Sequence, residues 1–158
     1  MPGIVVDGHF LHLGFDALQR ELRTPICLDE SITSEQAAAD AIQLGACSII
    51  NIKPGRVGGY LEARRIHDLC AKHDVPVWMG GMLETGLGRA GNVAMAAMPN
   101  FKLPGDTSAS SRYYHRDITE PFVLVDGRLN VPDGPGLGVN VDVAYVESIT
   151  TSSQVVRP

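Results

Sequence analysis

The chain has 158 residues and is 44% hydrophobic, which suits one globular domain with a sizeable core. A net charge of −5 argues against a nucleic-acid-binding or anionic-membrane surface, because both need clustered Lys and Arg. The sequence has no apolar run near the roughly 20 residues of a membrane helix, and its opening lacks the pattern of a signal peptide. Cys27, Cys47 and Cys70 have no C-x-x-C spacing and are predicted to be free, buried thiols of a cytoplasmic protein.

Residues 1–15 form an atypical N-terminal segment without a clear hydrophobic period. Residues 4–6 are compatible with a strand. His9 and His12 suggest a metal site, but no third ligand lies nearby, so packed or exposed histidines are the better interpretation. A helix is predicted over 16–22, and the Thr-Pro pair at 24–25 ends it.

The strongest pattern is a pair of apolar strands that each end in charged residues. The strand at 26–28 leads into Asp29 and Glu30, and the strand at 48–52 leads into Lys53. One helix separates them, so a parallel β/α unit would bring Asp29 and Lys53 to the same edge of the sheet. A carboxylate and an amine at that edge stand where α/β enzymes place their chemistry. Taken alone, Lys53 also fits a solvated loop, and Asp29 with Glu30 fits a helix-capping cluster.

Helices are predicted between and after these strands. Thr33 and Gln36 form a capping box for the first, and Gly45 is its C-terminal stop. A glycine-rich loop, 53–59, leads into a second helix at about Tyr60, whose predicted inward residues are Leu61, Ile66, Leu69 and Cys70. The next predicted elements are a strand at 75–79, a helix at 88–98 and a short strand at 101–103.

The predicted strands end at Asp29, Lys53, Gly80 and Pro104, which are 24, 27 and 24 residues apart. Such regular units are typical of a (β/α) barrel or a doubly wound sheet, and the polar or glycine-rich strand ends favour the barrel. No G-x-G-x-x-G follows a strand, so no nucleotide cofactor is expected.

The character of the chain changes at residue 120. Residues 122–125 and 128–131 flank Asp126-Gly127 and predict a hairpin with a tight turn. A tail rich in Pro and Gly follows. The predicted organisation is therefore an N-terminal segment at 1–15, a partial barrel at 16–119, and an antiparallel segment at 120–158 that ends in a flexible tail.

Four motifs in order, CLDES, NIKPGRVGG, GGMLETGLGRA and LPGDTS, resemble the enolase superfamily. More narrowly, they resemble the o-succinylbenzoate synthase / N-acylamino acid racemase branch of its muconate-lactonizing subgroup, over residues 15–143. The resemblance implies the C-terminal half of a (β/α)7β TIM-like barrel. Residues 16–119 would supply strands five to eight, and 120–158 would return to a capping domain.

The resemblance also implies residue roles. Asp29 matches an acidic ligand of Mg²⁺, Mn²⁺ or another divalent ion, and Lys53 matches the acid/base lysine. Glu30 and Asn51 are expected to support the metal and the lysine. The substrate, a small carboxylate, would lie against a pocket formed by Gly80, Gly81, Met82, Glu84, Asp106, Thr107 and Ser108. Without the resemblance, Glu84 could simply neutralise Arg89.

The implied reaction removes a proton α to a carboxylate. Returning the proton on the other face racemises an N-acylamino acid, whereas loss of a β-hydroxyl is the o-succinylbenzoate synthase reaction of menaquinone biosynthesis. Such a proton is very weakly acidic, so the developing charge needs a divalent cation, and Mg²⁺ prefers oxygen ligands such as Asp29. Lys53 would serve as a base if burial and a nearby cation lowered its pKa.

The family pattern is incomplete in this sequence. Two further acidic ligands and a Lys-x-Lys pair belong to barrel strands that the chain does not contain, and Asp7 is the nearest carboxylate to one of those positions. One carboxylate alone should not hold Mg²⁺ tightly. We therefore expect either an enzyme that works only with its missing N-terminal half or in a homo-oligomer, the isolated chain being inactive, or a non-catalytic half-barrel remnant or association module.

Overall fold

A computed structural model of the chain describes residues 4–6 and 14–156. Its centre is a parallel sheet in which four consecutive strands are neighbours, β1 (Ile4–Val6), β2 (Ile26–Leu28), β3 (Ile49–Ile52) and β4 (Val77–Met79). Ile4 pairs with Ile26, Cys27 with Ile49, and Ile50 with Val77. Because every pairing is parallel, the carboxyl ends of the strands lie along one edge, as predicted. Asp7, His9 and His12 lie outside the described residues.

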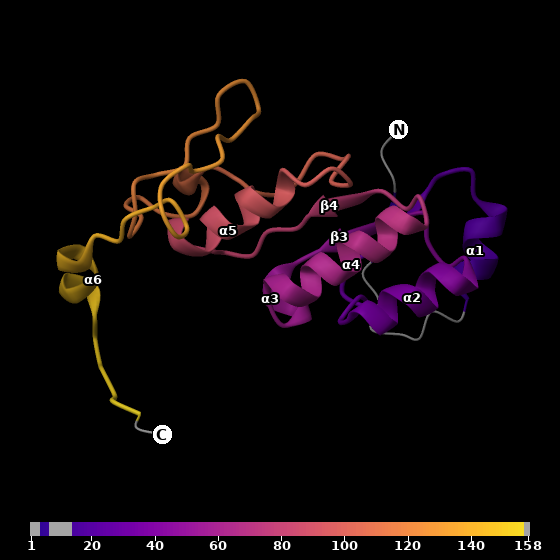
Figure 1. The fold of residues 1–158 in the computed structure, drawn as a ribbon, viewed down its shortest axis with the longest axis horizontal. Helices are drawn as coiled ribbons and strands as arrows, with labels where there is room; N and C mark the ends of the chain where they lie inside the picture. The colour runs from indigo at the N-terminus through magenta and orange to yellow at the C-terminus, as the bar shows by residue number, and fades with distance from the viewer. Residues whose placement is uncertain (1–3, 7–13, 157–158) are drawn as a thin grey trace.

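The helices follow the strands in the alternating order expected of β/α units (Figure 1). They are α1 (Phe15–Glu21), α2 (Glu35–Leu44), α3 (Pro54–Val57), α4 (Tyr60–Lys72), α5 (Gly86–Ala96), the short 3₁₀ helix η1 (Ser110–Arg112) and α6 (Val143–Ile149). Helices α2 and α4 pack side by side against the sheet, and α6 lies away from them, beyond α5 (Figure 1). Among residues 4–6 and 14–156, no helix is long and apolar enough to cross a membrane.

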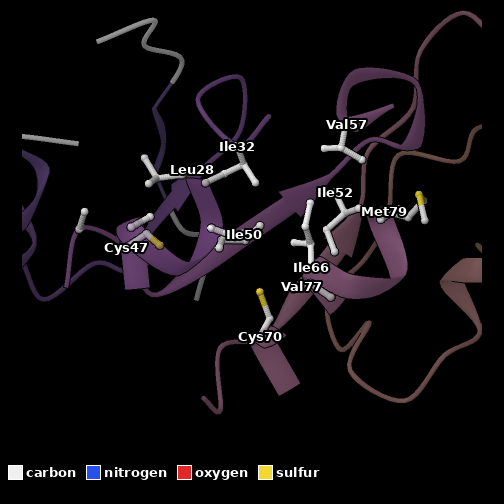
Figure 2. Packing of buried hydrophobic residues seen from close by; sticks show 14 of the residues in the cluster. Leu28, Ile32, Cys47, Ile50, Ile52, Val57, Ile66, Cys70, Val77 and Met79 are labelled. Carbon is white, nitrogen blue, oxygen red and sulfur yellow. The ribbon is translucent and has the colours of Figure 1, made fainter. Parts of the chain in front are cut away.

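The main hydrophobic core lies between the sheet and helices α2 and α4. Leu28, Ile50 and Ile52 from the strands converge there with Ile66 and Cys70 from α4 (Figure 2). Strands β2 and β3 are buried on both faces, as is usual for parallel strands covered on both sides. This arrangement explains why they read as nearly unbroken apolar runs in the sequence.

The three cysteines are free and buried, as predicted. Burial raises the pKa of the Cys47 thiol to about 12. It raises the pKa of Cys70 to about 12 as well. These two thiols therefore remain protonated at neutral pH and serve as small apolar core residues.

Two details of the predicted helices are wrong. Ser34, rather than Thr33, caps α2, because its extended backbone lets Oγ accept the Ala37 N–H at 3.1 Å. Gln36 instead bonds Asp40 one turn later, at 2.8 Å. In α4, Leu61 is 79% exposed rather than inward, whereas Ile66 and Cys70 are buried as predicted, together with Ala63 and His67.

The glycine-rich loop after β3 is in fact mostly helical. Pro54 begins α3, where its fixed φ and missing N–H cost little, and Gly58 ends it with a φ of 92°. This short helix turns the chain immediately after Lys53. It therefore keeps the residues that follow Lys53 close to the carboxyl edge of the sheet.

The predicted strand at 101–103 is reduced to one parallel bridge between Phe101 and Val77. Hydrogen bonds of 2.8 and 3.2 Å hold the surrounding chain to β4, from Asp106 N–H to the Met79 carbonyl and from Lys102 N–H to the Val77 carbonyl. The segment thus follows the edge of β4 without forming a regular strand. It nonetheless brings the loop at 104–108 to the end of β4.

The predicted turn at Asp126-Gly127 is present, but the long hairpin is not. Both residues have positive φ, 50° and 74°, and Val125 and Arg128 exchange backbone hydrogen bonds of 2.9 and 3.0 Å. Beyond this pair the flanking residues form no strands. A separate antiparallel bridge joins Thr119 to Val141. The antiparallel part of the described chain is therefore limited to two bridges.

Candidate active site

Asp29 and Lys53 meet at the carboxyl edge of the sheet, as their positions after β2 and β3 predicted. The Lys53 ammonium donates to Asp29 Oδ2 at 3.0 Å and to Glu30 Oε1 at 2.5 Å. The side chain of Lys53 is only 13% exposed. Three of the predicted site residues therefore form one partly buried ion cluster.

Arg56 completes this cluster and was missed in the sequence. Its Nη1 donates to Asp29 Oδ1, its Nη2 to the Asn51 carbonyl at 2.7 Å, and its Nε to the Ile32 carbonyl at 2.9 Å. The two oxygens of Asp29 are thus shared between two cations. The sequence feature that could have identified Arg56 is its position in the turn after Lys53. Helix α3 forms this turn and brings Arg56 to the end of β2.

The cluster controls the protonation of Lys53. Burial alone would lower the pKa of this amine, but hydrogen bonds to Glu30 and Asp29, together with their charges, outweigh burial and raise the pKa. The hydrogen bond from Lys53 in turn lowers the pKa of Glu30. In this arrangement the amine is held as an ammonium ion, whereas action as a base requires the lowered pKa that a cation near Asp29 would favour.

Gly80 makes room for the lysine side chain. A Cβ at this position would lie 2.2 Å from Asn51 Oδ1 and 2.6 Å from Lys53 Cγ. Asn51 is fully buried on the same face of β3 as Lys53, two residues before it. Its side-chain oxygen and nitrogen have no hydrogen-bond partner among the residues that the structure describes. The predicted supporting residue Asn51 therefore lies on the lysine's side of β3, and its side chain makes no hydrogen bond to the carboxylates of Asp29 and Glu30.

We expect Gly80→Ala to lower the free energy of unfolding by about 1–3 kcal/mol, because the added methyl overpacks this site. Gly55→Ala is the matched control, since a Cβ at Gly55 meets no atom within 4 Å. The control should be neutral or stabilising by up to about 1 kcal/mol in a helix. Urea denaturation of both variants measures the difference. Equal stabilities would contradict the close packing of Gly80 on Lys53.

The two predicted pocket loops, 80–84 and 104–108, lie against each other at the end of β4. A Cβ on Gly81 would lie 2.1 Å from the Asp106 carbonyl oxygen. Ser108 Oγ donates to Asp106 Oδ1 at 3.2 Å, and Thr107 between them is half-buried. Gly80 joins these loops to Lys53, so the structure brings the glycines and the Asp106 loop to the same end of the sheet.

Glu84 stabilises its own loop. Its carboxylate accepts the Met82 N–H at 2.8 and 2.9 Å and Asn92 Nδ2 at 2.9 Å. Arg89 donates to the backbone carbonyl of Glu84, at 2.8 Å, rather than to its carboxylate. Glu84 therefore neither neutralises Arg89 by an ion pair nor joins the Lys53 cluster, whereas Met82 is exposed at the tip of the loop.

The described residues do not form a divalent metal site by themselves. No group of three or more His, Cys, Asp or Glu within 4–6 and 14–156 is placed to hold an ion. Asp29 offers the oxygen atoms that Mg²⁺ prefers, but Lys53 and Arg56 already bind them. Asp29 is consequently one candidate ligand of an incomplete set.

Sequence comparison identifies the family of this half-barrel. Residues 10–146 match the family described as Enolase C-terminal domain-like. The chain belongs to this family. It is 67% identical over 140 residues to an N-succinylamino acid racemase from Amycolatopsis sp., covering 89% of this chain and 38% of the relative. It is 59% identical over 139 residues to an o-succinylbenzoate synthase from Geobacillus stearothermophilus, covering 87% of this chain and 37% of the relative.

The structure comparison supports the same assignment to the enolase superfamily. A solved superfamily member from Listeria innocua has a TM-score of 0.86 and 43% sequence identity, covering 94% of this chain and 41% of that chain. The chain therefore spans less than half the length of the relatives it matches. The predicted fold class, half of an enolase-type barrel, is confirmed.

Proposed function

We propose that this enolase-superfamily chain supplies the lysine side of an active site that removes a proton α to the carboxylate of a small substrate. The observation that carries the proposal is the contact of Lys53 Nζ with Asp29 Oδ2, 3.0 Å apart at the carboxyl edge of the sheet. The named relatives support two forms of this chemistry. One is the dehydration catalysed by o-succinylbenzoate synthase in the menaquinone pathway, and the other is racemisation of an N-acylamino acid.

Each residue of the cluster has a role in this proposal. Lys53 carries the proton that is exchanged at the α-carbon, and Gly80 leaves space for its side chain. Arg56 holds Asp29 in place through one carboxylate oxygen. Glu30 accepts from the Lys53 ammonium and fixes its direction. These contacts hold the amine at a defined point of the mouth of the half-barrel.

Completion of the site requires groups from outside the described residues. A divalent ion, when bound in this superfamily, neutralises the charge that develops on the substrate carboxylate. A dipeptide epimerase of the same fold was solved in complex with Mg. We propose that Asp29 is one ligand here and that an N-terminal half or a partner chain brings the others, the isolated chain being inactive.

The alternative function is that of a non-catalytic half-barrel or association module. The self-contained ion cluster favours this alternative, because the two carboxylates Asp29 and Glu30 already balance the two cations Lys53 and Arg56. In that case the cluster would serve only to join β2 to the turn after β3. Both functions are compatible with the fold, so a binding measurement has to separate them.

Calorimetry of Mg²⁺ binding, with and without o-succinylbenzoate, provides that test. We expect no tight binding by the 158-residue chain alone, and binding enhanced by o-succinylbenzoate once the remaining part of the Amycolatopsis racemase chain is added. The Asp29→Asn variant, measured under conditions in which it is folded, is the control and should abolish the enhancement. A folded, complemented assembly that binds no Mg²⁺ would support the non-catalytic alternative. Tight binding by the chain alone would instead indicate a site completed between copies.

A further inference from the structure

We infer that Arg89 is a positioning residue that holds both substrate-pocket loops, 80–84 and 104–108, through hydrogen bonds to their backbone. We call this link between the loops the brace. The inference rests on the proposed function, which assigns these loops to a carboxylate substrate. Arg89 lies in the first part of α5 and is 2% exposed, so it belongs to the interior of the protein. It is thus placed to act on the loops without contacting the substrate.

One guanidinium connects the two loops directly. Arg89 Nη2 donates to the carbonyl of Glu84 at 2.8 Å, and Nη1 donates to the carbonyl of Ser108. The two acceptors are 24 residues apart in the chain and belong to different loops. A planar guanidinium directs several N–H donors at fixed angles, so it can hold two carbonyls in one geometry, whereas an ammonium concentrates its donors at a single point.

Further contacts extend the brace to the loop tips. Asn92, one turn after Arg89 and also buried, donates to the Glu84 carboxylate, which accepts the Met82 N–H. On the other side, Ser108 Oγ donates to Asp106 Oδ1. Helix α5 therefore holds both the main chain and the carboxylate of Glu84. Arg89 is linked to Asp106 through Ser108, whose carbonyl accepts from Arg89 and whose Oγ donates to Asp106.

Arg89 carries a buried charge that is not paired with a carboxylate among residues 4–6 and 14–156. It takes part in none of the ion pairs among the described residues, its Nε has no partner there, and its Cζ lies 5.5 Å from the centre of the Tyr113 ring. Such a charge is costly to bury, so an arginine that only filled space would be a poor choice at this position. A cation beneath both loops also favours an anionic substrate over a neutral one.

Arg89→Lys tests the brace because it keeps the charge but loses the two-point geometry. Amide hydrogen exchange on the full chain should become about tenfold faster in both loops, which corresponds to one lost hydrogen bond. The reporters are the N–H groups of Met82, bonded to the Glu84 carboxylate, and of Asp106, bonded to the Met79 carbonyl. Amides of β2 and β3 should not change.

Arg116→Met is the matched control. Arg116 also stacks on a tyrosine, with its Cζ 4.0 Å from the Tyr145 ring, and bonds Asp142 at 2.7 Å, but it touches neither pocket loop. Exchange at Met82 and Asp106 should be unaffected by this substitution. Arg89→Met loses both hydrogen bonds and should accelerate exchange at the same amides at least as much as Arg89→Lys. If Arg89→Met fails to fold, Arg89→Lys decides the question.

Two exchange results would overturn the inference: no acceleration in one or both loops, or equal acceleration throughout the chain. In an assembly that turns over an N-succinylamino acid, Arg89→Lys should raise KM by about tenfold, the equivalent of one hydrogen bond, with kcat nearly unchanged. A fall in kcat at constant KM would also overturn it. If the assembly shows no activity, the proposed function fails, and the exchange result decides the brace independently.

Discussion

Replacing Lys53 with alanine should reduce α-proton exchange by about a thousandfold in a complemented, active assembly, because a positioned acid or base typically contributes about 10²–10⁴-fold. The amine is held between Asp29 and Glu30, and alanine removes it entirely. Arg56, the other cation of the cluster, does not replace it, since a guanidinium stays protonated. Exchange of the substrate α-proton for deuterium, followed by NMR in D₂O, measures the effect.

Lys72→Ala serves as the control for this experiment, because Lys72 is exposed at the end of α4. Its variant should exchange the proton at the unaltered rate. The Lys53→Ala chain should remain folded, since Asp29 keeps its bond to Arg56. Retained exchange in a folded Lys53→Ala assembly would remove Lys53 from the mechanism.

The placement of Asp29 beside Lys53 was predictable from the sequence. Both residues follow short apolar strands, and parallel strands joined by one helix bring their carboxyl ends together. The buried strands and the alternation of strand and helix come from hydrophobic patterns a few residues long. Such local patterns determine the order of the strands and helices. Because strands joined by one helix run parallel, they also determine the edge of the sheet at which Asp29 and Lys53 lie.

The contacts made by Arg56 and Arg89 were not predictable in this way. Arg56 reaches Asp29 only because the glycine-rich segment folds into α3, and Arg89 joins two loops whose distance is set by the whole half-barrel. The assignment of Leu61 to the core failed for a related reason. Helical periodicity leaves open which side of α4 faces the core, and it is the side of Ala63, which is fully buried, rather than that of Leu61, which is exposed.

The pKa of Lys53 likewise depends on contacts that the sequence alone did not predict. From the sequence, Asp29 was expected to bind a metal and Glu30 to support it. In the structure both carboxylates accept directly from the lysine and raise its pKa. The side chains next to the amine, rather than burial alone, therefore determine its charge in the half-barrel. Any cation that took over Asp29 would remove part of this stabilisation of the ammonium form.

Asp29→Asn is expected to lower the free energy of unfolding by about 3–5 kcal/mol, because it leaves the two partly buried cations Lys53 and Arg56 with one carboxylate, Glu30, between them. The Asp29 side chain is 10% exposed and contacts both Lys53 and Arg56, so the loss is not screened by water. Urea denaturation provides the measurement. Asp16→Asn is the control, since Asp16 pairs with the exposed Arg20 at 3.1 Å, and an exposed pair contributes at most about 1 kcal/mol.

A second substitution identifies the cause of that loss. Adding Arg56→Met to Asp29→Asn removes one of the two cations that then share Glu30, so the double variant should be more stable than Asp29→Asn alone. This recovery would show that uncompensated charge, rather than lost packing, destabilises the single variant. A change below about 1 kcal/mol in Asp29→Asn would contradict the buried-pair argument. The cluster would then be dispensable for folding, and its retention in a half-barrel would have to be explained by chemistry alone.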